Sequence, residues 1–156
     1  MKCKERMEQY LRENGVSFVG MRHAEAFTMQ EVAAALHVPG HQVAKVVMVK
    51  ADGEMAMLVV PAPYRLDFAK VRGLLGVKKV SLAEEEDFAG LFPDCETGAM
   101  PPFGNLYGVR VCADEALAEE KEMVFRVGTH QDSFKIAYAD FARLAQPTVG
   151  RFAAPA

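Results

Sequence analysis

The chain has 156 residues, a formal net charge of -3 and a composition in which 51% of the residues are hydrophobic. This length and composition predict one globular domain with a core large enough to need no disulfide or metal for stability. The net negative charge argues against a protein that coats nucleic acid through bulk positive charge, but it permits a local contact with an RNA end.

The N-terminal residues show no apolar run of the kind that marks a signal peptide, and no stretch approaches the roughly 20 apolar residues of a membrane span. We therefore expect a cytoplasmic protein without membrane contact. Its cysteines, Cys3, Cys95 and Cys112, form no CxxC pair and have no histidine at zinc-ligand spacing. The expectation is reduced thiols that serve as small packing residues, with no metal and no cofactor.

The first part of the chain predicts two helices separated by a short strand. The pattern of apolar residues predicts an amphipathic helix over residues 4–14 and a strand over residues 16–22. The segment Thr28-Met-Gln-Glu31 is a capping box, which predicts a second helix through Leu36 that ends at Val38-Pro-Gly.

A β-hairpin is expected next. Residues 43–50 and 55–60 are rich in valine and methionine, and both runs favour strands. Asp52-Gly53 lies between them and predicts a tight turn, while Pro61 and Pro63 end the return strand.

The second half predicts short elements separated by loops. Asp67 caps one expected helix, and the box Ser81-Leu-Ala-Glu84 opens another that runs to about Leu91. Strands are expected over residues 77–80, 106–112, 123–127 and 134–138, helical segments over 114–119 and 139–144, and an irregular tail over 149–156. Because helices and strands alternate but two strand pairs are adjacent, we predict an α/β domain with a mixed, largely antiparallel sheet.

The loop Gly98-Ala-Met-Pro-Pro-Phe-Gly104 is the first candidate for function. Two consecutive prolines fix φ and lack donors, while the flanking glycines permit sharp turns and close approach of another molecule. The remaining N–H groups can point outward and bind an anion; they belong to Gly98, Ala99, Met100, Phe103 and Gly104. The alternative is a proline-rich connector between two elements.

Lys45 is the second candidate, because it lies inside an apolar strand. By alternation it shares a face with Val43, Val47 and Val49, where a charged side chain is costly unless it reaches water, a partner or a ligand. A lysine that extends to solvent at the end of the strand is the alternative. His130 lies in a predicted polar turn, and a lone histidine of this kind is usually structural.

These features together resemble the YbaK/EbsC family, also called the prolyl-tRNA-synthetase-associated editing domain. The likeness is carried by Lys45 in its strand, the glycine–proline loop about fifty residues later, Thr28-Met-Gln-Glu-Val-Ala and Asp140-Phe-Ala-Arg-Leu. It runs from about residue 20 to 146 of a domain that we take as residues 1–156. The resemblance implies a partly barrel-like mixed sheet surrounded by helices.

The resemblance also implies an activity: hydrolysis in trans of mischarged aminoacyl-tRNA, most often tRNA for proline that carries Ala, Cys, Ser or Thr. The implied partners are the 3′ end of the aminoacyl-tRNA and prolyl-tRNA synthetase, with no DNA. A free ribose hydroxyl of the substrate would help to activate water. Two alternatives stay open, a non-catalytic module that binds a nucleotide or aminoacyl end, and a hydrolase of another small ester or amide.

By the family pattern, Lys45 is the essential lysine, and Gly98 with Pro101 or Pro102 falls on the family's glycine–proline loop. From the chemistry of ester hydrolysis we expect the backbone N–H groups of Gly98, Ala99 and Met100 to stabilise the oxyanion and Lys45 to position the substrate. The substrate-binding residues would be Pro101, Pro102, Phe103, Gly104, Thr28 and His130. Relatives inserted in synthetases carry a histidine after the glycine turn, near the place of Lys135, whereas His130 lies earlier. Phe103 and Tyr107 could stack on the terminal adenine or pack in the core.

Overall fold

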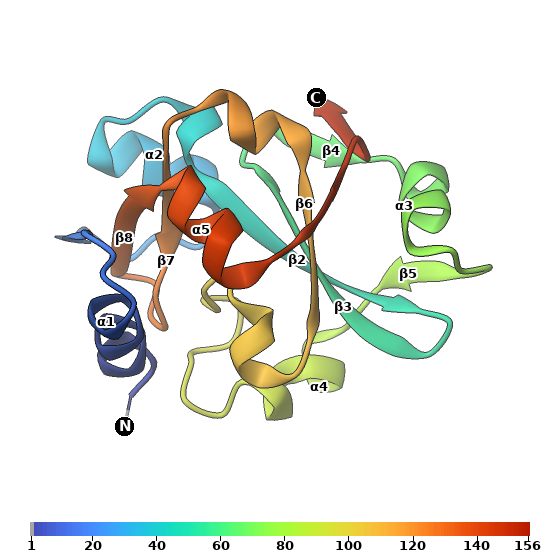
Figure 1. Ribbon diagram of the computed structural model, residues 1–156, viewed down its shortest axis with the longest axis horizontal. Helices are drawn as coiled ribbons and strands as arrows, with labels where there is room; N and C mark the ends of the chain where they lie inside the picture. Colours follow the sequence, from blue (N-terminus) through green and yellow to red (C-terminus); the bar gives the residue numbers. More distant parts are fainter. Residues whose placement is uncertain (1) are drawn as a thin grey trace.

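The computed structural model describes residues 2–156, and its largest sheet has the strand order β5-β2-β3-β6-β9 (Figure 1). Its strands are β2 (Ala44–Ala51), β3 (Glu54–Pro61), β5 (Val80–Leu82), β6 (Arg110–Asp114) and β9 (Thr148–Gly150). β2 runs antiparallel to β3 and β5, whereas β6 runs parallel to β3 and β9. The predicted mixed sheet is therefore confirmed.

Two smaller antiparallel sheets complete the strands. One has the order β1-β8-β7 and contains β1 (Val19–Arg22), β7 (Glu122–Arg126) and β8 (Asp132–Ala137). The other pairs β4 (Tyr64–Leu66) with β10 (Ala153–Pro155). A single parallel bridge between Val43 and Val124 joins the largest sheet to β7, and across residues 2–156 the strands do not close into a barrel.

In the part of the chain that the structure describes, five α-helices surround the sheets: α1 (Cys3–Glu13), α2 (Met29–Leu36), α3 (Phe68–Leu75), α4 (Glu85–Phe88) and α5 (Tyr138–Ala145). Short 3₁₀ helices cover Gly40–Gln42, Ala89–Leu91, Gly104–Tyr107 and Glu115–Glu119. None of the helices described in residues 2–156 has the length and apolar character needed to cross a membrane.

The helix caps show where local sequence fixes structure. The capping box predicted at Thr28 is present, and its hydroxyl accepts from the Glu31 N–H at 3.1 Å. Asp67 caps α3 as predicted. The box predicted at Ser81 is wrong, because Ser81 pairs with Lys50 as part of β5, and Glu84 caps α4 instead. The pairing of Ser81 with β2 thus delayed the start of the helix from Ser81 to Glu84.

The hairpin of β2 and β3 forms as predicted. Asp52 and Gly53 have φ values of 48° and 86°, and this pair of positive values suits the tight turns that join antiparallel strands. The pairing then aligns Lys45 opposite Val60. The turn therefore sets the position of Lys45 along the sheet.

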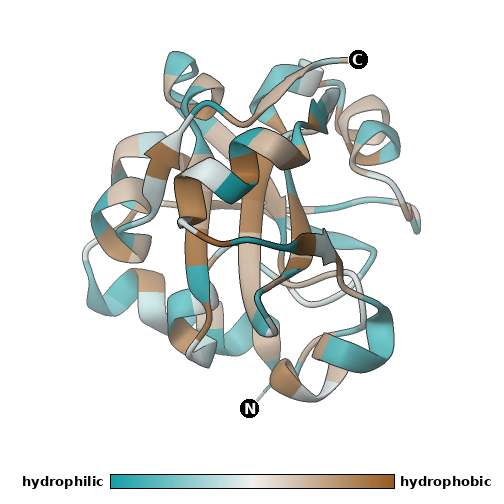
Figure 2. Ribbon diagram, turned by 90° about the vertical axis from the view of Figure 1, so that its right-hand side faces the viewer, coloured by the Kyte–Doolittle hydropathy of each residue, from teal (hydrophilic) through white to brown (hydrophobic). Residues whose placement is uncertain are grey.

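Both faces of the largest sheet are covered by apolar residues. Met48, Met57 and Val59 belong to a core shared with α1, α5, β7 and β8. Leu58 and Val60 point to the opposite side, toward a core shared with α3. Figure 2 shows the hydrophobic residues concentrated on the central strands, with hydrophilic residues on the outer elements.

Two expectations for the second half need correction. The segment 106–112 begins as the 3₁₀ helix Gly104–Tyr107, and its strand is limited to β6. The tail expected after residue 149 is ordered: β9 pairs with β6 and β10 pairs with β4. The buried Phe152 between them anchors this segment, with its N–H donating to Asp114 Oδ2 at 3.0 Å.

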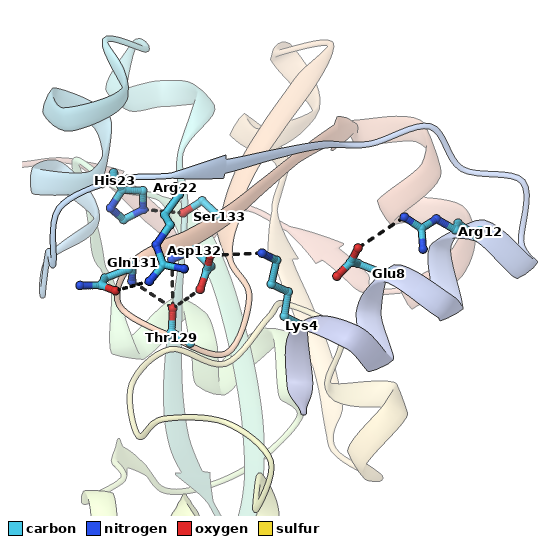
Figure 3. A network of polar contacts seen from close by, with 9 residues as sticks. All are labelled: Lys4, Glu8, Arg12, Arg22, His23, Thr129, Gln131, Asp132 and Ser133. Carbon is cyan, nitrogen blue, oxygen red and sulfur yellow. Dashed lines mark hydrogen bonds and ion pairs between the residues drawn. The ribbon is translucent and has the colours of Figure 1, made fainter. Parts of the chain in front are cut away.

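The turn between β7 and β8 is held by a polar network that reaches α1 and β1 (Figure 3). Thr129 Oγ1 donates to Asp132 Oδ2 at 2.7 Å, and Lys4 Nζ lies 3.4 Å from Asp132 Oδ1. Burial acts to raise the pKa of the Asp132 carboxyl, but the Thr129 hydrogen bond and the Lys4 charge outweigh it and leave the pKa below its usual 3.8. The network fixes the turn that contains His130.

This depressed pKa predicts acid-sensitive stability. A carboxyl whose pKa is lower in the folded state stabilises the fold above its unfolded pKa and loses that contribution as the pH falls through the folded pKa. We expect Asp132→Asn to lower the free energy of unfolding by about 1–3 kcal/mol at pH 7, because a hydrogen-bonded charge is lost. Urea unfolding at pH 7 and pH 3 should show the difference from wild type shrinking in acid. The exposed Glu119→Gln is the control, and a difference that is constant with pH would contradict the prediction.

Gly104 predicts a steric effect. A Cβ at this position would lie 2.9 Å from the Val109 carbonyl oxygen and 3.1 Å from Val111 Cγ2. We expect Gly104→Ala to destabilise the protein by about 1–3 kcal/mol, the typical cost of overpacking. Gly73→Ala is the matched control: it faces open space in α3, and alanine there should be neutral or stabilising. Thermal unfolding of both variants is the measurement, and equal melting temperatures would refute it.

Candidate active site

A cavity of about 300 Å³ opens where four segments meet. The entry to α2 contributes Phe27, Thr28, Met29 and Gln30, and the beginning of β2 contributes Ala44, Lys45 and Val46. The loop contributes Gly98 and Met100, and the end of β7 contributes Arg126. The structure therefore brings Lys45 beside the glycine–proline loop, as expected for a site, although the two are far apart in sequence.

Lys45 is a half-buried cation at this cavity. Its Nζ donates to the Tyr64 carbonyl oxygen at 2.5 Å, and no carboxylate among residues 2–156 forms a salt bridge with it. Burial, and secondarily the charge of Arg65, lowers the pKa of the Lys45 ammonium. A cation with only a neutral partner retains the capacity to bind a carbonyl or phosphate oxygen.

Arg126 is the second cation of the cavity, and it is only 6% exposed. Nη1 donates to the Gly98 carbonyl oxygen at 3.1 Å, and Nη2 donates to the Ala26 carbonyl oxygen at 2.8 Å. Nε has no partner, and no carboxylate in the described chain forms a salt bridge with the guanidinium. Burial lowers the pKa of the Arg126 guanidinium.

The loop backbone is bent at Gly98, whose φ is +88°. The positive φ, rather than a lack of space, restricts this position to glycine, since an added Cβ would make only an ordinary contact with His130 Nε2 at 3.7 Å. Within residues 2–156, the N–H groups of Gly98 and Met100 donate no hydrogen bond to the chain. Ala99 differs from the expectation, because its N–H donates to the Glu96 carbonyl oxygen at 3.0 Å and is not free.

Thr28 and Phe27 form the opposite wall. The Thr28 hydroxyl is occupied by the capping box, since it accepts from the Glu31 N–H and donates to Glu31 Oε1. Phe27 is 65% exposed, although apolar side chains of this size are usually buried. An exposed ring beside a cavity offers a flat surface on which a base or sugar can stack.

His130 adjoins the loop at Gly98 but does not line the cavity that contains Lys45. Its Nδ1 and its backbone N–H both bind Glu96 Oε1 at 3.0 Å, and its ring centroid lies 5.0 Å from that of Phe27. These two bonds from His130 lower the pKa of the Glu96 carboxyl. Lys135 sits instead on β8 with Glu122 4.0 Å away, so His130, and not Lys135, adjoins the loop.

The other loop residues expected to bind the substrate are buried and do not line the cavity. They are Pro101, Pro102, Phe103 and Gly104. The Phe103 ring packs edge-on against Phe125 and Phe141, each with centroids 5.7 Å away. The Tyr107 hydroxyl donates to Asp94 Oδ2 at 3.1 Å, away from the cavity. Of the two alternatives for Phe103, the structure has core packing.

Sequence reasoning missed Arg126 and Phe27. Arg126 carries the same signal that singled out Lys45, a charge within an apolar strand, here Met-Val-Phe-Arg-Val. Phe27 has no comparable signal, because an aromatic residue before a helix cap usually packs inward. Together the lining residues supply two cations, two backbone N–H groups without a partner in residues 2–156, and one exposed ring. Such groups can bind an anionic or carbonyl oxygen next to an apolar or aromatic group.

Comparisons with known proteins identify related sequences and a shared fold. The model of the aminoacyl-tRNA editing domain family matches residues 23–144. The chain is 27% identical over 128 residues to a proline–tRNA ligase of Leuconostoc citreum, which covers 80% of the chain and 22% of the ligase. It is 29% identical over 117 residues to the corresponding ligase of Thiobacillus denitrificans, which covers 74% of the chain and 20% of the ligase. The chain thus spans about a fifth of the length of these relatives.

A solved structure shares the fold. A protein described as a candidate trans-editing enzyme for prolyl-tRNA synthetase superposes with a TM-score of 0.82 at 22% identity, over 97% of both chains. The family match covers most of the present chain, from the residue after β1 into α5, and includes Lys45, the loop and Arg126. The chain therefore belongs to the aminoacyl-tRNA editing domain family.

Proposed function

We propose that this protein hydrolyses the ester bond of mischarged aminoacyl-tRNA, and that the cavity between Lys45 and the Gly98 loop holds the aminoacylated 3′ end. The observation that carries the proposal is the pair of cations, the half-buried Lys45 and the buried Arg126, which line one cavity without a carboxylate salt-bridge partner among the described residues. Such groups favour a ligand that brings oxygen atoms with negative charge. A charged tRNA end supplies a phosphate and an ester carbonyl.

The chemistry needs little from the side chains. Water attacks the carbonyl carbon, the bond from this carbon to the ribose oxygen breaks, and the ribose oxygen takes up the proton that the water loses. The negative charge that develops on the carbonyl oxygen would be stabilised by the free N–H groups of Gly98 and Met100 and by Lys45. Arg126 holds the Gly98 carbonyl and so fixes the direction of these donors.

The lining of the cavity contains no carboxylate, histidine or cysteine among the described residues. We therefore assign the activation of water to a free ribose hydroxyl of the substrate. A tRNA whose terminal ribose lacks the free hydroxyl should then be hydrolysed slowly.

The volume of the cavity limits the size of the aminoacyl group that it can hold. About 300 Å³ is at the lower limit of the volumes that bind small ligands. This favours a small aminoacyl group such as alanine, cysteine, serine or threonine. A synthetase separates such amino acids from its own substrate by only about 1–3 kcal/mol per methylene, so a second hydrolytic step is useful.

The relatives among proline–tRNA ligases support tRNA for proline as the carrier, with prolyl-tRNA synthetase as a partner. Such a role places the protein in the cytoplasm.

The same lack of a side-chain base favours one alternative, a module that binds the aminoacyl end without hydrolysing it. A panel of tRNA for proline charged with alanine, cysteine, serine, threonine or proline separates the two. Release of a non-cognate amino acid supports the enzyme, whereas binding without release supports the module. Equally fast hydrolysis of free small esters would indicate a general esterase.

Lys45→Ala tests the role of the lysine. We expect kcat/KM for deacylation to fall about 10²–10³-fold, because a charge that faces the developing oxyanion is lost. Deacylation of the best substrate in the panel is the measurement, with circular dichroism to confirm the fold. Lys135→Ala is the control, since Lys135 is also a strand lysine but lies outside the cavity beside Glu122. Equal activity of the two variants would remove Lys45 from the mechanism.

Phe27→Ala tests the stacking surface. We expect KM for aminoacyl-tRNA to rise about 5–150-fold with kcat little changed, because stacking of one base contributes about 1–3 kcal/mol. Leu82→Ala is the control, since Leu82 is also an exposed apolar residue, at 60%, but lies on β5. Steady-state kinetics measure both variants, and an unchanged KM for Phe27→Ala would show that this ring does not contact the substrate.

A further inference from the structure

A second hollow, of about 1020 Å³, is lined in part by residues 93–96 of the loop that leads to Gly98. At its wall, Cys3 from the start of α1 meets Asp94 and Cys95 from the loop after α4. One ligand atom from each, the two sulfur atoms and a carboxylate oxygen, all lie within 4.8 Å of one another. The three residues take no part in the cavity that contains Lys45.

The distances suit a tetrahedral metal ion. Cys95 Sγ lies 3.8 Å from Asp94 Oδ1, and no two of the three ligand atoms are more than 4.8 Å apart. Zinc with bonds of about 2.3 Å to sulfur and about 2.0–2.2 Å to oxygen separates neighbouring ligand atoms by roughly 3.5–3.8 Å. The cluster therefore needs a contraction of at most about 1 Å to close around an ion.

The surroundings hold the ligands in place. The Cys3 N–H donates to the Asp94 carbonyl oxygen at 3.1 Å, which ties the two segments together beside the cluster. Gly128 makes room for Cys3, since a Cβ there would lie 2.5 Å from Cys3 Cβ. The Tyr107 hydroxyl donates to Asp94 Oδ2 at 3.1 Å, the type of outer contact that orients a metal ligand.

Charge and access are also suitable. Arg6 lies 3.8 Å from Asp94 Oδ2, and its guanidinium carbon lies 4.4 Å from the centre of the Tyr107 ring, so one cation offsets part of the negative charge of the ligands. The Asp94 side chain is 15% exposed and lines the hollow, which gives an ion a way in.

We propose that Cys3, Cys95 and Asp94 form a binding site for a zinc-like divalent cation that joins α1 to the loop preceding Gly98. Two sulfur ligands select a borderline-soft ion over magnesium or calcium. The site is independent of the proposed deacylation, so either can fail without the other.

The test uses the full chain, reduced and freed of metal, and titrated with Co²⁺. We expect one Co²⁺ per chain, a thiolate-to-cobalt charge-transfer band, and displacement by Zn²⁺. Cys3→Ser, Cys95→Ser and Asp94→Asn should each weaken binding at least tenfold. Cys112→Ser is the matched control, because Cys112 is a buried thiol in the other core, and binding should be unchanged.

A second measurement does not depend on the variants folding. Zn²⁺ should raise the melting temperature of the wild-type chain, and a chelator should reverse this shift. Absence of both the band and the shift in the folded, reduced wild type would overturn the proposal. So would an unchanged band in both folded cysteine variants, or a Cys3–Cys95 disulfide that forms in air while the reduced chain binds no metal.

Discussion

A buried guanidinium that bonds two backbone carbonyls from different segments holds the site together. Arg126 extends from the end of β7 to the Ala26 carbonyl, just before α2, and to the Gly98 carbonyl in the loop. Three walls of the cavity thus share one side chain, and β2 supplies the fourth. Val43, the residue before β2, forms a bridge with Val124 of β7 and so joins this wall to the others. Leaving a buried charge with only carbonyl partners is costly, and such a cost is typical of positions kept for a ligand.

The loop prolines and Phe103 are buried and support the site without lining the cavity. Phe103 is buried between Phe125 and Phe141, and this packing anchors the rigid loop whose Gly98 and Met100 donors face no partner in the described chain. A stiff backbone seated on a packed core loses little entropy when a ligand binds, which suits a site that works by positioning. The packing of Phe103 in the core therefore helps to hold the loop in one conformation.

Local sequence signals predicted much of the fold, and tertiary pairing explains the rest. The Thr28 capping box and the Asp52-Gly53 turn depend on a few adjacent residues, so they could be predicted. The Ser81 box failed because pairing with β2 took that residue into a strand. In the site, Lys45 and the loop gave signals of their own, whereas Phe27 is identifiable only by its exposure, and the cluster of Cys3 with Cys95 only by long-range folding.

The two short strands β9 and β10 have a consequence for aggregation. β9 adds to β6 and β10 adds to β4, so they cover strand edges that would otherwise be open. An unpaired edge of β6 could pair with another chain. The buried Phe152, which lies between β9 and β10, therefore also protects the protein from edge-to-edge association.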